Sequence, residues 1–157
     1  MMNQQKKNSL KTRPQTNPVS STAGFLLSPS NGEKILPGSG PPPHLHENED
    51  ESIYVIDGEF EILLGAKTMR AEPEAFVFIP KRTVHRFRCI GDGPGKVLLH
   101  FTPGGIEGFF REAGVPATND GLAPSVDSAE ITRTDMAGKR YGLRVIDWED
   151  GKRVDLS

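Results

Sequence analysis

Three histidines and one glutamate stand at spacings that suit a metal ion. His44 and His46 are one residue apart, Glu51 follows them closely, and His85 lies further along the chain. In an extended strand, side chains two positions apart point to the same side, so both imidazoles of the pair would face one direction. Imidazole nitrogens with one carboxylate oxygen suit iron, manganese, nickel, copper, cobalt or zinc better than calcium or magnesium. The alternative is a polar loop that holds its histidines by coincidence.

Glu51 is the unusual member, because it shares a strand face with apolar residues. The stretch SIYVIDGEFEILLG places apolar-rich runs on both sides of Asp57-Gly58, a pair preferred in two-residue hairpin turns. If this hairpin forms, the pairs on one face are Val55–Phe60, Ile53–Ile62 and Glu51–Leu64, and those on the other are Tyr54–Glu61 and Ile56–Glu59. The first face is the predicted core, and a lone carboxylate pointing into it is costly unless paired or bound to a metal.

The elements that must position these side chains are mainly short strands. Seventeen glycines and thirteen prolines separate short apolar runs, a rhythm typical of an all-β sandwich or barrel. Beyond the hairpin, the pattern predicts strands at 67–72, 75–80, 83–89 and 95–103, and a late edge strand at 141–148. Helical spacing predicts one helix at 106–114 and a second at 127–142, capped by Asp127 or Ser128. We therefore expect a small β-barrel with one or two helices near its end.

Composition and charge exclude several other classes of protein. A net charge of −2 gives no sign of a polyanion-binding surface, so nucleic acid is not an expected partner. The single cysteine, Cys89, excludes an intrachain disulfide framework and is consistent with a reducing compartment. The N-terminal residues lack the apolar segment of a secretory signal, and no apolar run approaches the ~20 residues that span a bilayer. We expect a cytoplasmic protein without membrane contact.

The chain is expected to form one folded domain behind a flexible arm. Residues 1–21 are polar and contain Pro14 and Pro18, so they offer too little apolar surface to offset the entropy of ordering. Residues 22–157 suffice for a single domain and are short for two.

The motifs around the four candidate ligands resemble the signatures of the cupin family. Residues 38–58 match the first signature, G-x5-H-x-H-x4-E-x6-G, without a gap. Residues 74–89 resemble the second, G-x5-P-x-G-x2-H-x3-N, at Pro80 and His85. The stretches TPGGIEGFFREAG and AGKRYGLRV also resemble the ends of small single-domain cupins similar to quercetin dioxygenases.

Three positions depart from the second signature. Glu74 and Arg82 replace its glycines, and Cys89 replaces its asparagine. At Arg82 the turn either keeps a left-handed conformation, which costs a non-glycine residue about 1 kcal/mol, or takes another shape. The family's asparagine is not a ligand, so Cys89 leaves the site intact.

The resemblance implies a fold, a metal site and an assembly. The fold would be a double-stranded β-helix, the jelly-roll barrel of cupins. His44, His46, Glu51 and His85 would hold one divalent transition metal per chain, iron or manganese before nickel, cobalt, copper or zinc. The protein would be a homodimer, with the N-terminal arm or residues 141–148 covering a sheet edge.

The resemblance also implies an activity. Three imidazoles and one carboxylate leave one or two open positions on a five- or six-coordinate ion, as in working metal sites. In quercetinase-like cupins a chelating substrate and O2 meet at such an ion, and the glutamate acts as a base, which would make Glu51 catalytic. The first hypothesis is therefore a metal-dependent dioxygenase or related oxidoreductase acting on a small organic substrate. The alternatives are a non-catalytic small-molecule binding or sensing cupin and an isomerase or lyase that needs no O2. An apolar barrel interior, as opposed to polar sugar-binding groups, would help to separate them.

Other reactive or aromatic residues have simpler interpretations. His100 falls on the strand face opposite Val97, so a structural or surface role is expected. Cys89 is expected to be a small buried residue. Phe109 and Phe110 either pack a terminal helix against the barrel or form a lid over its mouth.

Overall fold

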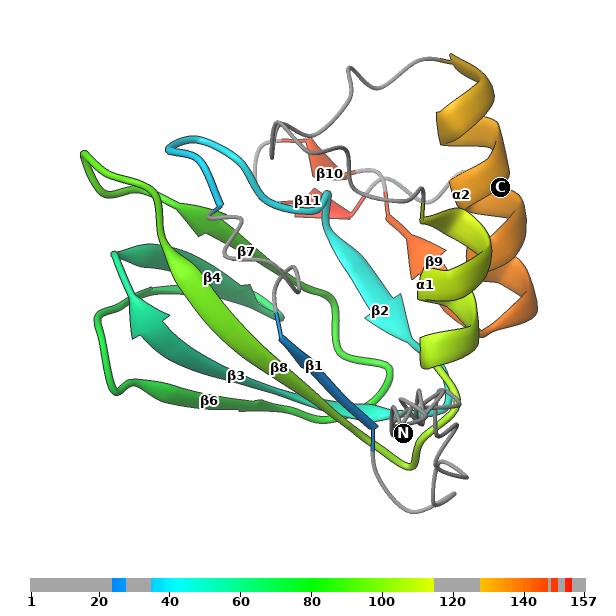
Figure 1. Ribbon diagram of the computed structural model, residues 1–157, viewed down its shortest axis with the longest axis horizontal. Coiled ribbons are helices and arrows are strands. Elements are labelled where there is room, and N and C mark those ends of the chain that lie inside the picture. The colour runs from blue at the N-terminus through cyan, green and yellow to red at the C-terminus, as the bar shows by residue number, and fades with distance from the viewer. Residues whose placement is uncertain (1–23, 28–34, 115–127, 147, 150–151, 154–157) are drawn as a thin grey trace, which may run out of the picture.

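The computed structural model describes residues 24–27, 35–114, 128–146, 148–149 and 152–153 (Figure 1). The strands are β1 (Gly24–Leu27), β2 (His44–His46), β3 (Asp50–Asp57), β4 (Phe60–Leu64), β5 (Lys67–Ala71), β6 (Phe76–Ile79), β7 (His85–Cys89), β8 (Lys96–Thr102), β9 (Leu143–Val145), β10 (Trp148–Glu149) and β11 (Lys152–Arg153). The helices are α1 (Glu107–Ala113) and α2 (Ser128–Arg140). The arm predicted at residues 1–21 lies outside the described residues.

Two antiparallel sheets make up the barrel. One has the strand order β1-β8-β3-β6 and the other β5-β4-β7-β2-β9, while β10 and β11 pair separately. Between β2 and β8 the chain crosses from one sheet to the other at every connection except the β4–β5 hairpin. This is a double-stranded β-helix, so the predicted all-β fold with C-terminal helices is confirmed. Neither helix in the described part of the chain has the length and apolar character needed to cross a membrane.

The core lies between the sheets and follows the predicted alternation. Ile53 and Val55 are fully buried, whereas Tyr54 and Ile56 are 38% and 40% exposed. Both sheets contribute to the main apolar cluster, which contains Ile53, Val55, Phe60, Ile62, Ala71, Ile79, Phe87, Cys89 and Val97. The predicted inward face of residues 51, 53 and 55 is therefore confirmed.

The predicted hairpin partner of β3 is wrong. β3 pairs with β6 and β8, where Val55 faces Val97, while β4 pairs with β5 and β7. The Asp57-Gly58 turn joins the two sheets instead of two neighbouring strands. Gly58 has a φ of +80°, and a Cβ there would lie 2.6 Å from the Gly95 Cα, so glycine is required for this corner. The two-residue period of a strand determines on which face of the sheet a side chain lies. The strand with which it pairs is determined by contacts between residues that are distant in sequence.

The C-terminal elements lie together beside β2 (Figure 1). α1 packs against α2, and α2 packs against β9, which pairs with β2 at the edge of its sheet. Both predicted helices and the late edge strand are confirmed. The cap proposed at Asp127 or Ser128 lies outside the described side chains.

Two non-glycine residues occupy the left-handed backbone region. Glu74 has a φ of 73° and Arg82 a φ of 64°, and both stand where the second cupin signature has glycine. The turns therefore keep the shape that glycine would favour. The Arg82 turn also supports a ligand strand, because the Arg82 N–H donates to the carbonyl of His46 at 2.7 Å.

We expect Arg82→Gly to exceed Arg82→Ala in free energy of unfolding by about 1 kcal/mol, because alanine retains the left-handed strain and glycine relieves it. Both variants remove the exposed guanidinium, whose Nε lies 3.3 Å from Glu47 Oε2, so their difference isolates the backbone. Urea denaturation measures it. At an ordinary position the order would be reversed, because glycine increases the entropy of the unfolded chain. An alanine variant as stable as the glycine variant would contradict the strain.

Candidate metal centre

Strands β2, β3 and β7 bring the four predicted residues together. His44, His46, Glu51 and His85, here called the His/Glu cluster, are all buried, and each offers a ligand atom within 4.8 Å of the others. The two-residue spacing on β2 turns His44 and His46 into the barrel, and the antiparallel register places His44 beside His85. Glu51 comes from the opposite sheet, where it lies between Ile79 and Phe101 on the neighbouring strands.

Backbone carbonyls orient two of the imidazoles. The Nδ1 atom of His44 lies 2.9 Å from the Pro42 carbonyl, and the Nδ1 atom of His85 lies 2.9 Å from the Thr83 carbonyl. A carbonyl can only accept, so each Nδ1 carries the proton and each Nε2 is left to act as a ligand. Metal-binding histidines are held in this way, with the outer nitrogen donating to a carbonyl or carboxylate.

His46 and Glu51 complete the set. The Nε2 atom of His46 lies 3.1 Å from Glu51 Oε2, but without hydrogen-bond geometry, so neither ring nitrogen of this buried side chain has a hydrogen-bond partner among the described residues. The same Glu51 oxygen lies 2.8 Å from the Nε2 atom of His85. An unpartnered buried imidazole is costly in an apolar interior, and a cation within this ring of donors would satisfy it. The residues therefore fit a metal ion.

Electrostatics keep two members of the cluster, His44 and Glu51, in the protonation state that a metal needs. Burial, helped by the nearby His85, lowers the pKa of His44 to about 4, so its imidazole is neutral. Burial alone would raise the pKa of Glu51, but the close contacts with His46 and His85 outweigh it and lower the pKa to about 2. A neutral imidazole and an ionised carboxylate are the ligand forms that bind metal.

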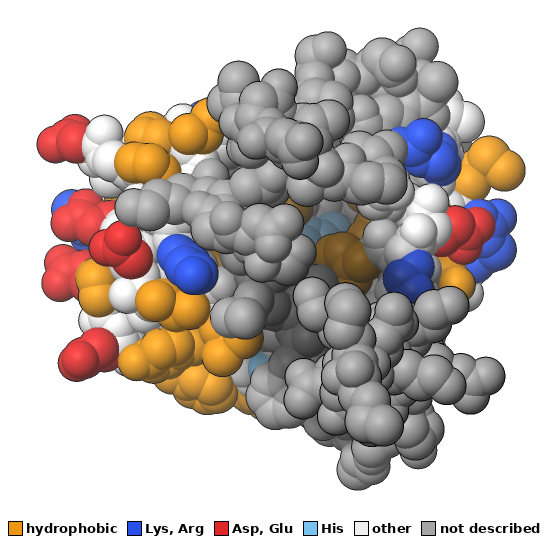
Figure 2. Space-filling view, viewed as in Figure 1, with side chains coloured by type: hydrophobic (Ala, Val, Ile, Leu, Met, Phe, Trp, Pro, Cys, Tyr) orange, Lys and Arg blue, Asp and Glu red, His pale blue; other side chains and the backbone are white. Residues whose placement is uncertain are grey.

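An apolar cavity of about 220 Å³ opens beside the cluster. Besides His44, His46 and Glu51, it is lined by Pro41, Pro42, Phe87, Leu99, Phe101, Phe109, Phe110, Thr134, Leu143 and Val145. Figure 2 shows histidine side chains at the bottom of a hollow, next to hydrophobic side chains. The interior beside the candidate metal site is therefore apolar, the property expected to separate the functional hypotheses.

The cavity contains residues that sequence reasoning did not assign to the site. Leu99 and Phe101 carried a signal, since they share the inward face of their strand, but nothing local placed them beside the histidines. Of the two interpretations offered for Phe109 and Phe110, packing of the helix is confirmed for Phe109, and the lid stays a prediction. Phe109 is buried in a second apolar cluster with Phe101, and both phenylalanines line the cavity.

His100, Cys89 and Glu49 are not members of the His/Glu cluster. His100 is not one of its ligands, and its Nε2 lies 3.4 Å from the hydroxyl of Thr102. Cys89 is fully buried, as predicted. Glu49, in the acidic run 47–50 between the histidine pair and Glu51, is buried instead of exposed to solvent. Glu49 is only 5% exposed, its Oε2 has no partner among the described residues, and burial raises its pKa.

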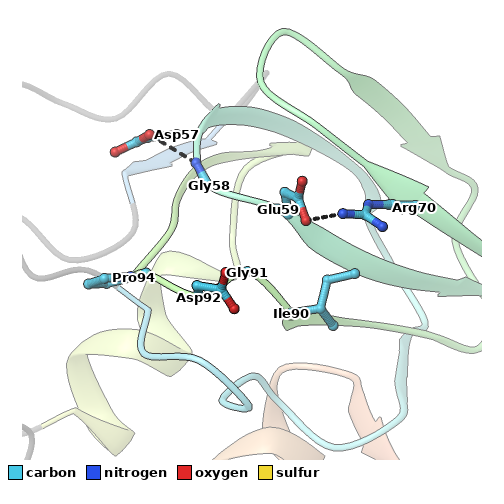
Figure 3. A pocket seen from close by; sticks show the side chains of 9 residues that line it. Asp57, Gly58, Glu59, Arg70, Ile90, Gly91, Asp92 and Pro94 are labelled. Carbon is cyan, nitrogen blue, oxygen red and sulfur yellow. Dashed lines mark hydrogen bonds and ion pairs between the residues drawn. The ribbon is translucent and has the colours of Figure 1, made fainter.

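A second hollow lies at the turn between β3 and β4 (Figure 3). Its lining is polar and rich in glycine, with acidic side chains at Asp57, Glu59 and Asp92. Glu59 is paired with Arg70, and Asp57 accepts a hydrogen bond from the Gly58 N–H. These contacts satisfy acidic groups at the turn, and the hollow has no histidine among its lining residues.

We expect the metal-free protein to lose stability as the pH falls from about 6.5 to 4. In the unfolded chain His44 takes up a proton near pH 6.5, whereas in the folded protein its pKa is about 4. The unfolded state then binds more protons, so the free energy of unfolding decreases with falling pH, by up to ~1.4 kcal/mol per pH unit for one proton. His44→Asn should reduce this slope, because the asparagine amide nitrogen takes the place of Nδ1 and can still donate to Pro42 but does not titrate. Equal slopes for both proteins, from urea unfolding with chelator present, would contradict the neutral buried imidazole.

The family comparison covers the region that contains this centre. Residues 33–101 match the family model Cupin_2, described as a cupin domain. All four residues of the His/Glu cluster lie within the matched segment.

Known proteins share this region over part of their length. The chain is 31% identical over 86 residues to "Polyketide synthase CurC" of Streptomyces cyaneus, covering 54% of this chain and 53% of that protein. It is 29% identical over 92 residues to quercetin 2,3-dioxygenase of Bacillus subtilis (strain 168), covering 59% of this chain and 26% of the dioxygenase. The solved structure of KdgF from a Halomonas species is similar with a TM-score of 0.45 and 23% identity, over 58% of this chain and 87% of that one. This chain therefore spans about half the length of CurC and about a quarter of the dioxygenase. The match to the family model, together with the two signatures and the double-stranded β-helix, identifies residues 33–101 as a cupin domain.

Proposed function

We propose that this protein binds one divalent transition metal at the His/Glu cluster and uses it to oxygenate a small, largely apolar organic substrate. The observation that carries the proposal is the apolar cavity, because it opens directly on His44, His46 and Glu51. Among the other described lining residues, Thr134 is the one with a polar side chain. A substrate in this cavity must therefore direct its polar atoms to the cluster itself.

The four residues would hold the ion with three imidazoles and one carboxylate. The carbonyls of Pro42 and Thr83 leave the Nε2 atoms of His44 and His85 for this role, and His46 has both ring nitrogens without hydrogen bonds. Iron or manganese fits such a nitrogen and oxygen set, with nickel, cobalt, copper and zinc as further candidates. When bound, the ion would supply Lewis acidity and the redox chemistry for a reaction with O2.

The cavity favours a chelating aromatic or enolic substrate. An apolar cavity of ~150 Å³ holds benzene, so about 220 Å³ accommodates roughly one substituted ring. Phe101, Phe109 and Phe110 would contact such a ring, while two adjacent oxygens reached the cluster. A sugar would press hydroxyls against these phenyl rings, and each hydroxyl without a partner costs about 1–3 kcal/mol. This argues against a sugar substrate.

Glu51 would have two tasks in this proposal. Its low pKa keeps it ionised, which suits it to hold the ion. The same carboxylate borders the cavity and could accept a proton from a substrate hydroxyl there. A carboxylate with a pKa of about 2 is a weak base, so Glu51 would take a proton only from a substrate hydroxyl whose own pKa a bound ion would lower.

Two alternative functions use the same site. The first is O2-independent isomerase or lyase chemistry, and the partial similarity to a protein named as a polyketide synthase would fit a polyketide substrate. The second is binding or sensing of a small molecule without turnover. Both keep the metal and the apolar cavity, so the requirement for O2 separates them from the first proposal.

We expect one metal ion per chain, and His46→Ala or His85→Ala should lose most of it, because each removes one of four ligands. His100→Ala is the matched control, since His100 lies outside the cluster and the variant should retain full occupancy. Mass spectrometry of the metal, on protein purified without chelator or affinity-tag nickel, measures occupancy. Full occupancy in both cluster variants would contradict the ligand assignment.

We also expect bound metal to raise the thermal midpoint, because a ligand held only by the native state stabilises it by about 2.7 kcal/mol at a hundredfold excess over Kd. Chelator at pH 7.5 should lower the midpoint of the wild type and leave that of His85→Ala nearly unchanged. Differential scanning calorimetry makes the comparison. A wild-type midpoint that responds to neither chelator nor added metal would count against a metal in this site.

We expect metal-dependent O2 uptake with a chelating enol or β-diketone of about one ring in size, measured at an oxygen electrode with the iron-, manganese-, cobalt- and nickel-loaded protein. Glu51→Gln should retain part of the metal but lose ~10²–10⁴-fold in turnover, the usual contribution of a general base. His85→Ala should abolish uptake, and His100→Ala should leave it unchanged. If substrate disappears equally fast without O2, the first alternative is correct. Tight binding without turnover for every metal would support the sensing function.

A further inference from the structure

His46 differs from the other two imidazoles of the His/Glu cluster in the surroundings of its outer nitrogen. The Nδ1 atoms of His44 and His85 each lie 2.9 Å from the carbonyl two residues earlier in the chain. The Nε2 atom of His46 lies 3.1 Å from Glu51 Oε2, and its Nδ1 atom is buried without a hydrogen-bond partner among the described residues. An ion bound at Nε2 requires the proton of the neutral ring on Nδ1. A buried N–H without an acceptor is costly, so a metal-bound His46 needs an acceptor on this side of the ring.

Glu49 offers a buried acceptor near this imidazole. It lies in the turn between β2 and β3, three residues after His46, and its side chain is 5% exposed. The Oε2 atom of Glu49 is buried and has no hydrogen-bond partner within the described part of the chain. Burial raises the pKa of Glu49, and the neighbouring His46 partly offsets this effect, so the two side chains act on each other electrostatically. The ring lacks one acceptor, and the carboxyl group lacks one donor.

We propose that Glu49 is a positioning residue for the metal, because its carboxyl oxygen accepts a hydrogen bond from the Nδ1–H of His46. This inference rests on the proposed metal at the His/Glu cluster. A carboxyl group keeps an oxygen that can accept whether or not it is ionised, so the bond does not depend on the charge of Glu49. An outer acceptor of this kind fixes the tautomer and orientation of a ligating imidazole and makes its other nitrogen a stronger ligand. Glu49 would therefore do for His46 what backbone carbonyls do for His44 and His85.

Glu107 provides a matched control for the charge of Glu49. Its carboxylate acts electrostatically on Glu49, but it already accepts a hydrogen bond from the Gly105 N–H at 2.7 Å. Glu107→Gln removes a neighbouring negative charge and keeps an oxygen for the Gly105 N–H. An effect of charge alone on the metal would therefore appear in this variant as well, whereas an effect of the hydrogen bond to His46 would not.

Zinc affinity, measured by calorimetric titration in competition with a chelator, tests the proposal. Glu49→Met should bind zinc about 10- to 100-fold more weakly than the wild type, which is the usual effect of losing an outer partner of a ligand. Glu49→Gln should retain most of the affinity, because its amide oxygen can accept the same hydrogen bond. Glu107→Gln should bind zinc like the wild type. In urea denaturation, zinc should stabilise Glu49→Met less than it stabilises the wild type, whereas a purely structural role would lower the stability of the zinc-free and zinc-loaded protein equally.

The ring proton of His46 gives a direct readout by nuclear magnetic resonance of isotope-labelled, zinc-loaded protein. In Glu49→Met the Nδ1 proton of His46 should shift or exchange faster with water, while those of His44 and His85 stay unchanged because carbonyls hold them. Wild-type zinc affinity in Glu49→Met, an equal loss of affinity in Glu107→Gln, or an unchanged His46 proton would each overturn the proposal. A wild type that binds no zinc, iron or manganese would overturn the proposed metal site as well, which distinguishes that failure from the failure of this inference alone.

Discussion

The site depends on one buried carboxylate surrounded by imidazoles. Glu51 is 2% exposed, and one of its oxygens lies within 3.1 Å of His46 and 2.8 Å of His85. A charge removed from water is tolerated only where opposite charge or hydrogen-bond donors replace the solvent. Strands β2 and β7 must therefore come close to β3, although they belong to the other sheet. The barrel geometry meets this requirement at the end that the helices cover.

The two ends of the barrel differ in polarity. At the helical end, Phe109 and Phe110 of α1 and two residues of β9, Leu143 and Val145, line the cavity beside the cluster with apolar side chains, and α2 contributes Thr134. At the opposite turn, between β3 and β4, acidic side chains and glycines line a polar hollow (Figure 3). A low-polarity environment strengthens electrostatic contacts with bound ligands, so the apolar end is the one equipped for metal chemistry.

Two departures from the second cupin signature show that the fold needs the backbone path of the motif more than it needs the glycines themselves. Glu74 and Arg82 adopt the left-handed backbone despite their side chains, and the Arg82 turn still supports β2 through the His46 carbonyl. The backbone path is therefore retained while the residue type changes.

The sequence by itself determined what depends on residue type and short spacing. The two-residue period placed Glu51, Ile53 and Val55 on the inward face, and the spacing of His44 and His46 turned both imidazoles to one side. Helical spacing located α1 and α2, and the signature motifs indicated the double-stranded β-helix. Apart from the fold, which the resemblance to the cupin signatures implied, these inferences concern residues within about one element of each other, where backbone geometry leaves few choices.

Only the tertiary structure decided which distant segments meet. The Asp57-Gly58 turn is compatible with a hairpin, yet it is a corner between sheets, and β3 pairs with β6 and β8 instead of β4. The burial of Glu49 and the meeting of Leu99, Phe101 and Phe110 beside the histidines were likewise invisible in local patterns. Strand pairing and cavity lining depend on contacts across the whole barrel. A local pattern sets the direction of a side chain, but the packing of the complete chain selects its neighbours.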